Sequence, residues 1–225
     1  MQDQGLDVDL RIKNSDLKKL KSQNLRFKIM RIFHPNPLLL TFLFLISFTS
    51  AVRAQTDPFA DTNARIRPLI TSGNDKAHKK DYDGAIADFT EAIKLGKDLP
   101  DQLRAGPYVN RGMAYADKGD LDAGLADLDK AIKLWPNNVY AYQDRGLIHR
   151  KRNELDNALT DFNKAIKLNS KFPAPYMSRG LILLSQGKDA EADADFAKYL
   201  QLFPAGKDGL DKDIADVKAK RAAKP

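Results

Sequence analysis

The sequence contains no cysteine among its 225 residues. Disulfide bonds, thiolate metal sites and cysteine nucleophiles are therefore excluded. The same absence excludes the cysteine-linked lipid that bacterial lipoproteins carry. A chain without thiols is compatible with any redox compartment.

Histidine is also scarce, and the three residues, His34, His78 and His149, are far apart in the sequence. The carboxylates recur at regular intervals instead of gathering as a catalytic pair. Neither a glycine-rich phosphate loop nor a nucleophile motif is present. The sequence predicts a protein that is not an enzyme and that has no cofactor and no metal site.

The excess of basic residues is confined to the N-terminal part of the chain. The formal net charge is +7, but residues 1–54 hold nine Lys/Arg and four Asp/Glu, a surplus of five, which leaves 7 − 5 = +2 for the rest. A nucleic-acid-binding protein normally carries a basic stripe on its folded part. The nearly neutral remainder argues against that class of protein.

Residues 30–54 have the pattern of a secretory signal peptide. A short basic start at Met30 is followed by an apolar run from Leu38 to Phe48 and by small residues that end at Ala54. A membrane anchor is disfavoured because a helix of this run spans only about 16 Å, against roughly 30 Å of hydrocarbon. We expect export with cleavage after Ala54.

A signal peptide normally starts at the initiator methionine, so residues 1–29 are unexpected. We interpret them as a non-translated or disordered extension, with translation starting at Met30. Residues 55–65 have turn-forming residues and no apolar period, which predicts a linker.

Four segments of the chain repeat the same residue types. The second, third and fourth follow one another at an offset of 34 residues, whereas the first is offset by 39 because Gly96 to Arg104 lengthens its connection. Repetition at this period indicates a stacked array of small units. The recurring residues are Tyr108, Tyr142 and Tyr176, Arg111-Gly112, Arg145-Gly146 and Arg179-Gly180, and Asp127, Asp161 and Asp195.

Each unit contains two apolar stretches with a period of 3.6 residues, which predicts two helices joined by a tight turn. In the second unit, Gly119 suits the left-handed residue that ends a helix, and Asp122 is expected to cap the next helix. The corresponding residues in the other units are Lys80 and Asp83, Asn153 and Asp156, and Gly187 and Asp189.

This pattern resembles the tetratricopeptide repeat, which reads W-x2-L-G-x2-Y, then A-x3-F, a small residue and P. The first unit matches least well, since Lys76 occupies the position of an aromatic residue, and His149 takes that core position in the third unit. The second unit matches with Tyr108, Gly112, Tyr115, Gly124, Leu128, Ala131 and Pro136.

The resemblance implies an all-α fold, a right-handed α-solenoid of about four tetratricopeptide helix-turn-helix repeats plus a C-terminal capping helix. Leu210, Ile214 and Val217 share one helical face that could cover the last repeat. The expected repeats are 66–104, 105–138, 139–172 and 173–206, and the expected capping helix with its basic tail is 207–225.

Arg111, Arg145 and Arg179 stand where the repeat usually has leucine, and aspartates recur on the second helices. We expect structural ion pairs, within or between units, because the guanidinium group suits bidentate pairing with a carboxylate. If pairing stays within a unit, Asp88 is left over; if it runs to the next unit, Asp195 is. The alternative is a row of cations that binds an acidic ligand.

In this family the first helices line a concave groove that binds an extended peptide or a partner's helix. The matching positions here are mostly apolar or amide, and methionine suits adaptable contacts. The Lys/Asn set with which some members clamp a C-terminal carboxylate is lacking. The expected partner-binding residues are Val109, Asn110, Met113, Tyr140, Gln143, Asp144, Leu147, Arg150 and Met177.

These observations predict a protein–protein interaction adaptor in the periplasm or cell envelope, periplasmic or secreted. Its partner would be a protein or peptide, with no nucleic acid, and with membrane contact only through the signal sequence before cleavage. Two alternatives remain: a self-assembling structural scaffold of an envelope complex, and an accessory subunit of an envelope-polymer enzyme.

Overall fold

The computed structural model describes residues 58–223. The expected N-terminal extension, the signal peptide and the first residues of the linker lie outside the described residues. So do the last two residues of the basic tail.

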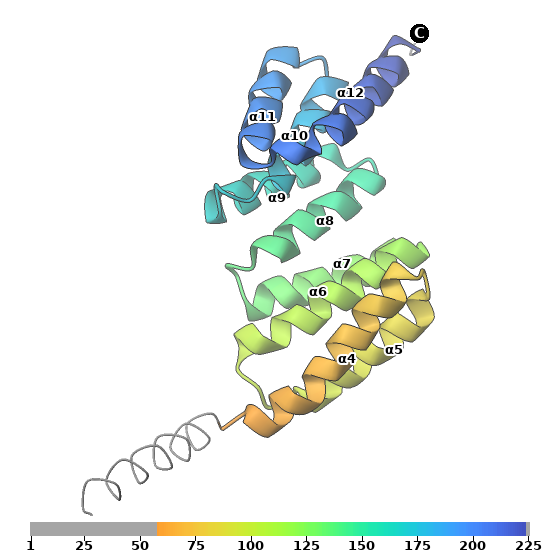
Figure 1. The fold of residues 1–225 in the computed structure, drawn as a ribbon, viewed down its shortest axis with the longest axis vertical. Coiled ribbons are helices and arrows are strands. Elements are labelled where there is room, and N and C mark those ends of the chain that lie inside the picture. Colours follow the sequence, from red (N-terminus) through yellow and green to blue (C-terminus); the bar gives the residue numbers. More distant parts are fainter. Residues whose placement is uncertain (1–57, 224–225) are drawn as a thin grey trace, which may run out of the picture. The chain divides into compact units, whose positions relative to one another are not determined.

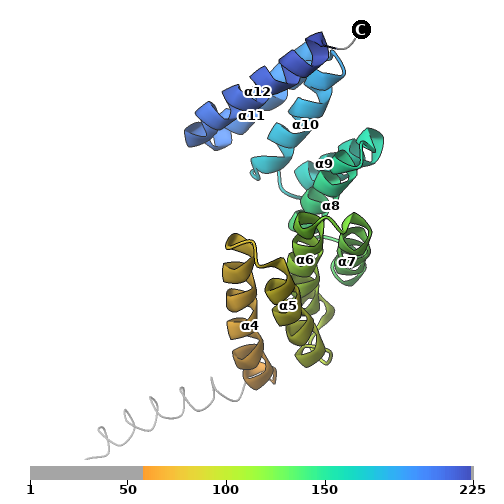
Figure 2. The ribbon, with the colours of Figure 1, turned by 90° about the vertical axis from the view of Figure 1, so that its right-hand side faces the viewer.

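The described chain is built from helices, and residues 58–223 contain no β-strand. A short 3-10 helix, η2, covers Pro204–Gly206. The α-helices, seen in two views in Figures 1 and 2, are α4 (Ala60–His78), α5 (Tyr82–Leu95), α6 (Asp101–Lys118), α7 (Leu121–Leu134), α8 (Val139–Lys151), α9 (Leu155–Leu168), α10 (Ala174–Ser185), α11 (Asp189–Leu202) and α12 (Lys207–Ala222).

Consecutive helices form pairs that stack on one another (Figure 1). The first helices, α4, α6, α8 and α10, each pack against their own second helix, and α6, α8 and α10 also pack against the second helix of the preceding pair. First helices of neighbouring pairs are in contact as well. The predicted all-α solenoid of four helix pairs with a terminal helix is confirmed.

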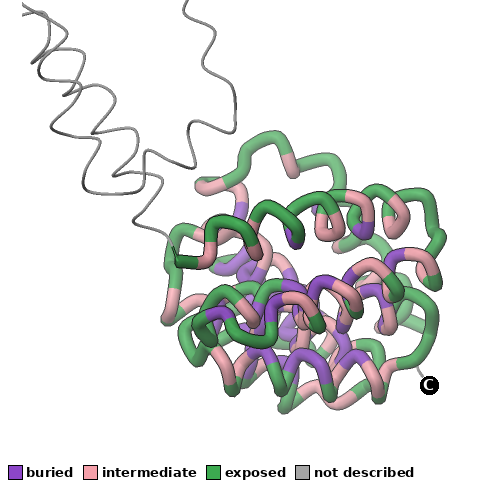
Figure 3. The backbone as a smooth tube through the Cα atoms, turned by 90° about the horizontal axis from the view of Figure 1, so that it is seen from below, coloured by how far each residue is buried: buried purple, intermediate pink, exposed green. Residues whose placement is uncertain are grey.

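A glycine on each first helix allows its second helix to approach closely. In three pairs the glycine faces a buried phenylalanine ring: a Cβ on Gly146 would lie 2.6 Å from Cε1 of Phe162, and Gly73 and Gly180 have the same relation to Phe89 and Phe196. In the second pair, Gly112 instead packs closely on Leu128 and on Gly124. These recurring contacts place the core between paired helices, where Figure 3 shows the buried segments.

The predicted helix breaks lie where the backbone turns left-handed. Gly119 and Gly187 have φ angles of 105° and 78°, and Lys80 and Asn153 adopt 63° and 61°. Only glycine takes this conformation without steric cost, although asparagine tolerates it better than lysine. Lys80 is therefore the most strained of the four.

The predicted helix caps were wrong by two residues. Asp81 and Asp120, not Asp83 and Asp122, accept hydrogen bonds from the free backbone N–H groups at the starts of α5 and α7. Asp83 and Asp122 lie inside the first turn, where a negative charge favours the helix dipole. The residues expected to cap α9 and α11, Asp156 and Asp189, are likewise first-turn residues.

Two of these first-turn aspartates connect neighbouring helix pairs. Lys118 at the end of α6 reaches Asp83 on α5 at 2.6 Å, and Arg152 after α8 pairs with Asp122 on α7. We call these contacts junction pairs. Each joins the end of one first helix to the start of the preceding second helix.

Two boundaries also differ from expectation. Helix α4 begins at Ala60, so the second half of the expected linker is helical. Helix α6 begins at Asp101, after Pro100, so part of the lengthened connection before the second unit is helical too. The added turns are largely exposed, so they lack the apolar period by which a helix is predicted from sequence.

Helix α12 covers the last pair, as predicted. Leu210 is 1% exposed, and Ile214 and Val217 pack against the same cluster of buried residues, which includes Leu184 and Tyr199. The helix lies mainly against α10. Within residues 58–223, no helix has the length and apolar character needed to cross a membrane.

Candidate partner-binding face

The nine predicted partner-binding residues all lie on the first helices, on α6, α8 and α10. We call the surface formed by their exposed and half-buried members the first-helix face. Tyr140 is the most accessible, at 59% exposed, and its ring meets that of Phe172 edge-on at 5.3 Å. The half-buried members are Asn110, Met113, Asp144, Leu147, Arg150 and Met177.

Val109 and Gln143 do not belong to this face, which corrects the prediction. Val109 is 6% exposed and packs in the core with Leu128 and Ala141. Gln143 is 5% exposed, and its Nε2 donates a 3.2 Å hydrogen bond to Oγ of Ser178, which ties α8 to α10. Neither side chain is accessible to a partner.

The amide of the face, Asn110, is joined to an amide on α4. Nδ2 of Asn110 on α6 donates to Oδ1 of Asn74 on α4 over 3.3 Å. Their neighbours contribute apolar surface: Leu147 packs on the cluster that contains Phe162, and Met177 on the cluster around α12. The face thus combines apolar side chains with one amide.

Asp144 is a half-buried carboxylate on α8. Its burial, and secondarily the negative charge of Asp117 on α6, raise the pKa of Asp144 to about 7. Within the described chain its side chain has no hydrogen bond and no ion pair, whereas Asp117 is paired with Lys151 at 3.1 Å. Near neutral pH, Asp144 therefore exchanges between its neutral and charged forms.

Arg150 lies six residues further along α8. Its burial lowers the pKa of the guanidinium, and the charge of Asp213 on α12 opposes that effect. The group makes neither a hydrogen bond nor an ion pair with any residue in 58–223. Asp144 and Arg150 thus leave two opposite charges uncompensated on one helix, one toward α6 and one toward α12.

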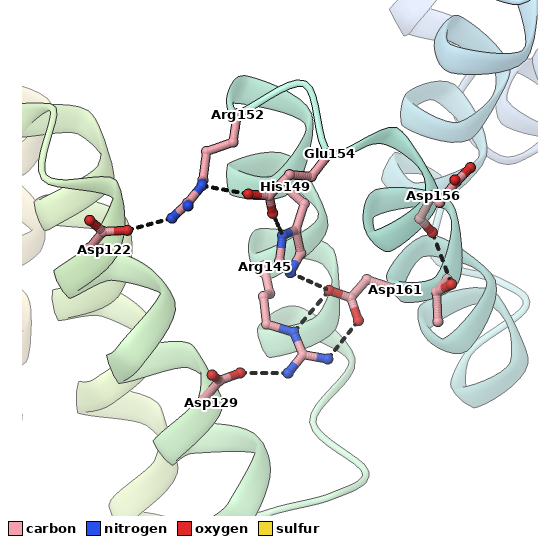
Figure 4. Close-up of polar contacts among 9 residues, drawn as sticks. Asp122, Asp129, Arg145, His149, Arg152, Glu154, Asp156 and Asp161 are labelled. Carbon is pink, nitrogen blue, oxygen red and sulfur yellow. Dashed lines mark hydrogen bonds and ion pairs between the residues drawn. The ribbon is translucent and has the colours of Figure 1, made fainter.

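Each recurring arginine forms an ion pair with an aspartate, as predicted from the sequence. Arg145 donates from Nε and Nη2 to the two oxygens of Asp161 at 2.9 and 2.7 Å, and from Nη1 to Asp129 of the preceding pair at 2.6 Å (Figure 4). Arg111 and Arg179 repeat this arrangement with Asp127 and Asp195.

These pairs stay within a repeat, and the left-over aspartate, Asp88, is paired with Lys76 at 2.7 Å. Lys76 thus replaces the aromatic residue of the repeat with an ion pair. The arginines also reach the preceding pair, through Thr90, Asp129 and Asn163. The alternative, a row of free cations for an acidic ligand, does not fit these contacts.

His149 is not the apolar core residue that its position suggested. Its Nδ1 lies 2.6 Å from Oε2 of Glu154, and its Nε2 lies 3.9 Å from Asp161 (Figure 4). The hydrogen bond with His149 lowers the pKa of Glu154, and Arg152 adds to that effect. This network joins the end of α8 to the start of α9. Sequence reasoning missed it because the partners lie across a turn.

A cavity of about 520 Å³ opens at the C-terminal end of the first-helix face. It lies between α8, α10 and α12, and its lining includes Arg150 and Leu181. Because it depends on how α12 packs, the repeat pattern could not predict it. In the described part of the chain, no group of three or more histidines and carboxylates is placed to hold a metal ion.

Family models match the chain in two places. A model described as "Tetratricopeptide repeat" matches residues 105–138, and one described as "TPR repeat" matches residues 146–187. The comparison with curated proteins gave no match.

Two solved structures illustrate the likeness of fold. A tetratricopeptide repeat protein from Parabacteroides merdae ATCC 43184 is 20% identical, with 69% of this chain and 60% of that chain covered and a TM-score of 0.54. MamA (41-end) from Desulfovibrio magneticus RS-1 is 19% identical, with 62% and 76% covered and a TM-score of 0.51. The repeat motifs, the stacked helix pairs and the two matching family models together show that the chain contains tetratricopeptide repeats.

Proposed function

We propose that this protein is a non-enzymatic scaffold for protein–protein interaction, which binds a segment of a partner polypeptide on its first-helix face. The supporting observation is the accessible apolar surface that this face presents on successive helices. Tyr140 stands out, because it is 59% exposed, whereas Met113 and Leu147 are half-buried. Aromatic and methionine side chains are favoured at protein interfaces.

The test is affinity capture that compares the wild-type protein with a Met113→Glu, Tyr140→Glu variant. Both side chains are at least partly exposed, so two added charges should repel a partner without entering the core. Leu147 is left intact because it packs on the buried Phe162. We expect the captured partner to be lost or strongly depleted.

The matched control is Ala126→Glu, Thr160→Glu, which adds the same two charges at exposed positions of α7 and α9. This control should capture the partner as the wild type does. Equal capture by all three proteins would exclude the first-helix face. Circular dichroism at the capture temperature checks that each variant is folded.

We further propose that the protein acts in the periplasm or cell envelope after cleavage behind Ala54. The support is the signal-like sequence of residues 30–54. N-terminal sequencing of the protein from fractionated cells tests this location. A mature chain that begins at Gln55 in the envelope fraction is expected, whereas a cytoplasmic chain that retains Met30 would contradict it.

A further inference from the structure

The cavity between α8, α10 and α12 is large enough for a side chain or a short peptide segment. Its volume of about 520 Å³ lies within the range of small-ligand sites, about 300 to 1,000 Å³. Leu181 and Val217 provide apolar wall, and charged groups reach it from two helices. The charged lining residues are Arg150, Asp213, Asp216, Lys220 and Arg221.

Most of these charges are already balanced. Arg221 donates to both carboxylate oxygens of Asp189 and to the backbone oxygen of Leu184. Lys220 lies 3.6 Å from Asp216, on the next turn of the same helix. Among the described residues, these contacts leave Arg150 and Asp213 without an ion pair.

The two remaining groups differ in their surroundings. Asp213 is exposed, so water solvates its carboxylate, whereas Arg150 is half-buried. Burial lowers the pKa of Arg150 even though Asp213 attracts its charge from across the cavity. A partly desolvated guanidinium is stabilised by an anion that reaches it inside the cavity, where the attraction is less screened than at the surface.

Arg150 is also not part of the repeat. The equivalent residues at the 34-residue offset are Ala116 and Leu184, both buried in the core. The recurring arginines at the other position each have a bidentate aspartate. Repeat architecture therefore does not account for a guanidinium at this site.

In the described structure, the junction between the third and fourth helix pairs, which lies beside the cavity, lacks a junction pair. Gln186, directly after α10, is equivalent to Lys118 and Arg152, and the equivalent first-turn aspartate is Asp156. No junction pair joins them in the described structure. The cavity lies beside this junction, with Asn153 and Ser185 in its lining.

We propose that this cavity binds an acidic peptide by pairing one of its carboxylates with Arg150. The inference rests on the proposed function, because it specifies the chemistry of the bound partner. Guanidinium binds a carboxylate through two parallel hydrogen bonds, as the other repeats already illustrate inside the fold. Arg221 and Lys220 are each balanced by an aspartate, so Arg150 provides the attraction, and Asp213 opposes the ligand.

The probes are three short peptides titrated into the full chain and followed through the side-chain NMR signals of Arg150. The first is acetyl-Ala-Glu-Glu-Ala-amide, the second replaces both glutamates by glutamine, and the third is the glutamine peptide with a free C-terminal carboxylate. We expect the glutamate peptide to shift the Arg150 signals and to bind about tenfold more tightly than the amidated glutamine peptide. Binding of the third peptide without binding of the glutamate peptide would assign the carboxylate to a chain terminus and overturn the proposal of an acidic side chain.

Variants make the assignment specific. Arg150→Gln should weaken binding of the glutamate peptide about tenfold, and Asp213→Asn should strengthen it about threefold, because the competing charge is gone. Arg152→Gln is the matched control: it removes the same charge two residues away, outside the cavity lining, and should leave affinity unchanged. A role of Arg150 in folding alone would not produce the gain in Asp213→Asn.

Equal affinity for the glutamate and amidated glutamine peptides, or an effect of Arg152→Gln as large as that of Arg150→Gln, would overturn the proposal. Failure here is distinguishable from failure of the scaffold function. If Met113→Glu, Tyr140→Glu abolishes partner capture while the glutamate peptide does not bind, the scaffold function stands and the cavity assignment fails. Thermal melts of each variant confirm that the fold is intact.

Discussion

Arg145 and Asp161 are joined by two parallel hydrogen bonds between the helices of one repeat, and the same guanidinium holds Asp129 of the repeat before it. One side chain thus fastens a helix pair internally and attaches it to its neighbour. The carboxylate of Asp161 is 4% exposed, so the pair is largely removed from water. Its strength depends on both partners being present.

Arg145→Gln should therefore destabilise the protein strongly. It leaves Asp161 buried without a counter-charge, which costs about 3 to 5 kcal/mol. Arg152→Gln breaks more exposed pairs and should cost less than about 1 kcal/mol. Urea denaturation monitored by circular dichroism measures both, and similar losses in the two variants would contradict the assignment.

Gly146→Ala should destabilise by about 1 to 3 kcal/mol, because its Cβ would approach the fully buried ring of Phe162 to 2.6 Å. Gly106 is the control. It lies inside α6 with open space where a methyl group would stand, so Gly106→Ala should instead stabilise by about 0.5 to 1 kcal/mol through helix propensity. Thermal unfolding distinguishes the two, and a loss of equal size at both positions would show that backbone effects dominate.

Asp144 should make stability fall as pH rises. Because the folded pKa, about 7, exceeds the unfolded value of about 3.9, the folded state holds a proton that the unfolded state releases between these values. Burial of the charged form costs stability throughout this window, and the cost reaches its maximum above pH 7.

Asp144→Asn should match the wild type near pH 4 and exceed its stability at pH 8 by about 4 kcal/mol, which is the shift of about 3 pKa units at 1.36 kcal/mol each. Urea denaturation of both proteins at several pH values gives the difference, which isolates Asp144 from the other carboxylates, including the nearby Asp117. Asp193→Asn, at an exposed position of α11, serves as the control. A constant difference across the range would contradict the raised pKa.

Lys80→Gly should stabilise by about 1 kcal/mol, because glycine adopts the φ of 63° without the clash that lysine suffers. Lys79→Gly, at a φ of −83°, gains no such relief and should be neutral or destabilising. Differential scanning calorimetry of the two variants gives the shift in Tm. A higher Tm in Lys79→Gly than in Lys80→Gly would disprove the strain.

The sequence predicts the parts of the structure that each repeat specifies by itself. The left-handed residues at Gly119 and Gly187 and the bidentate partners of Arg145 recur at a fixed offset, so a pattern reveals them. The cap at Asp120 was missed because two aspartates, two residues apart, compete for the same role. In the structure the capping residue is Asp120, which directly precedes the first helical residue.

The candidate site is less predictable, because exposure on a first helix depends on its neighbours. Gln143 reads as an accessible amide, yet Ser178 on the next helix binds it inside the core. The cavity beside Arg150 depends on the packing of α12 against α10, for which the repeat provides no template. Non-repeated contacts of this kind are invisible to a periodic pattern.

The missing junction pair between the third and fourth repeats also has a mechanical meaning. Under tension applied along the array, the ends of the first two junctions are held by Lys118 with Asp83 and by Arg152 with Asp122, whereas Gln186 provides no such hold. We expect the junction between the third and fourth helix pairs to separate first when the molecule is pulled. The last repeat and α12 would then separate as one block, at a force that depends little on salt.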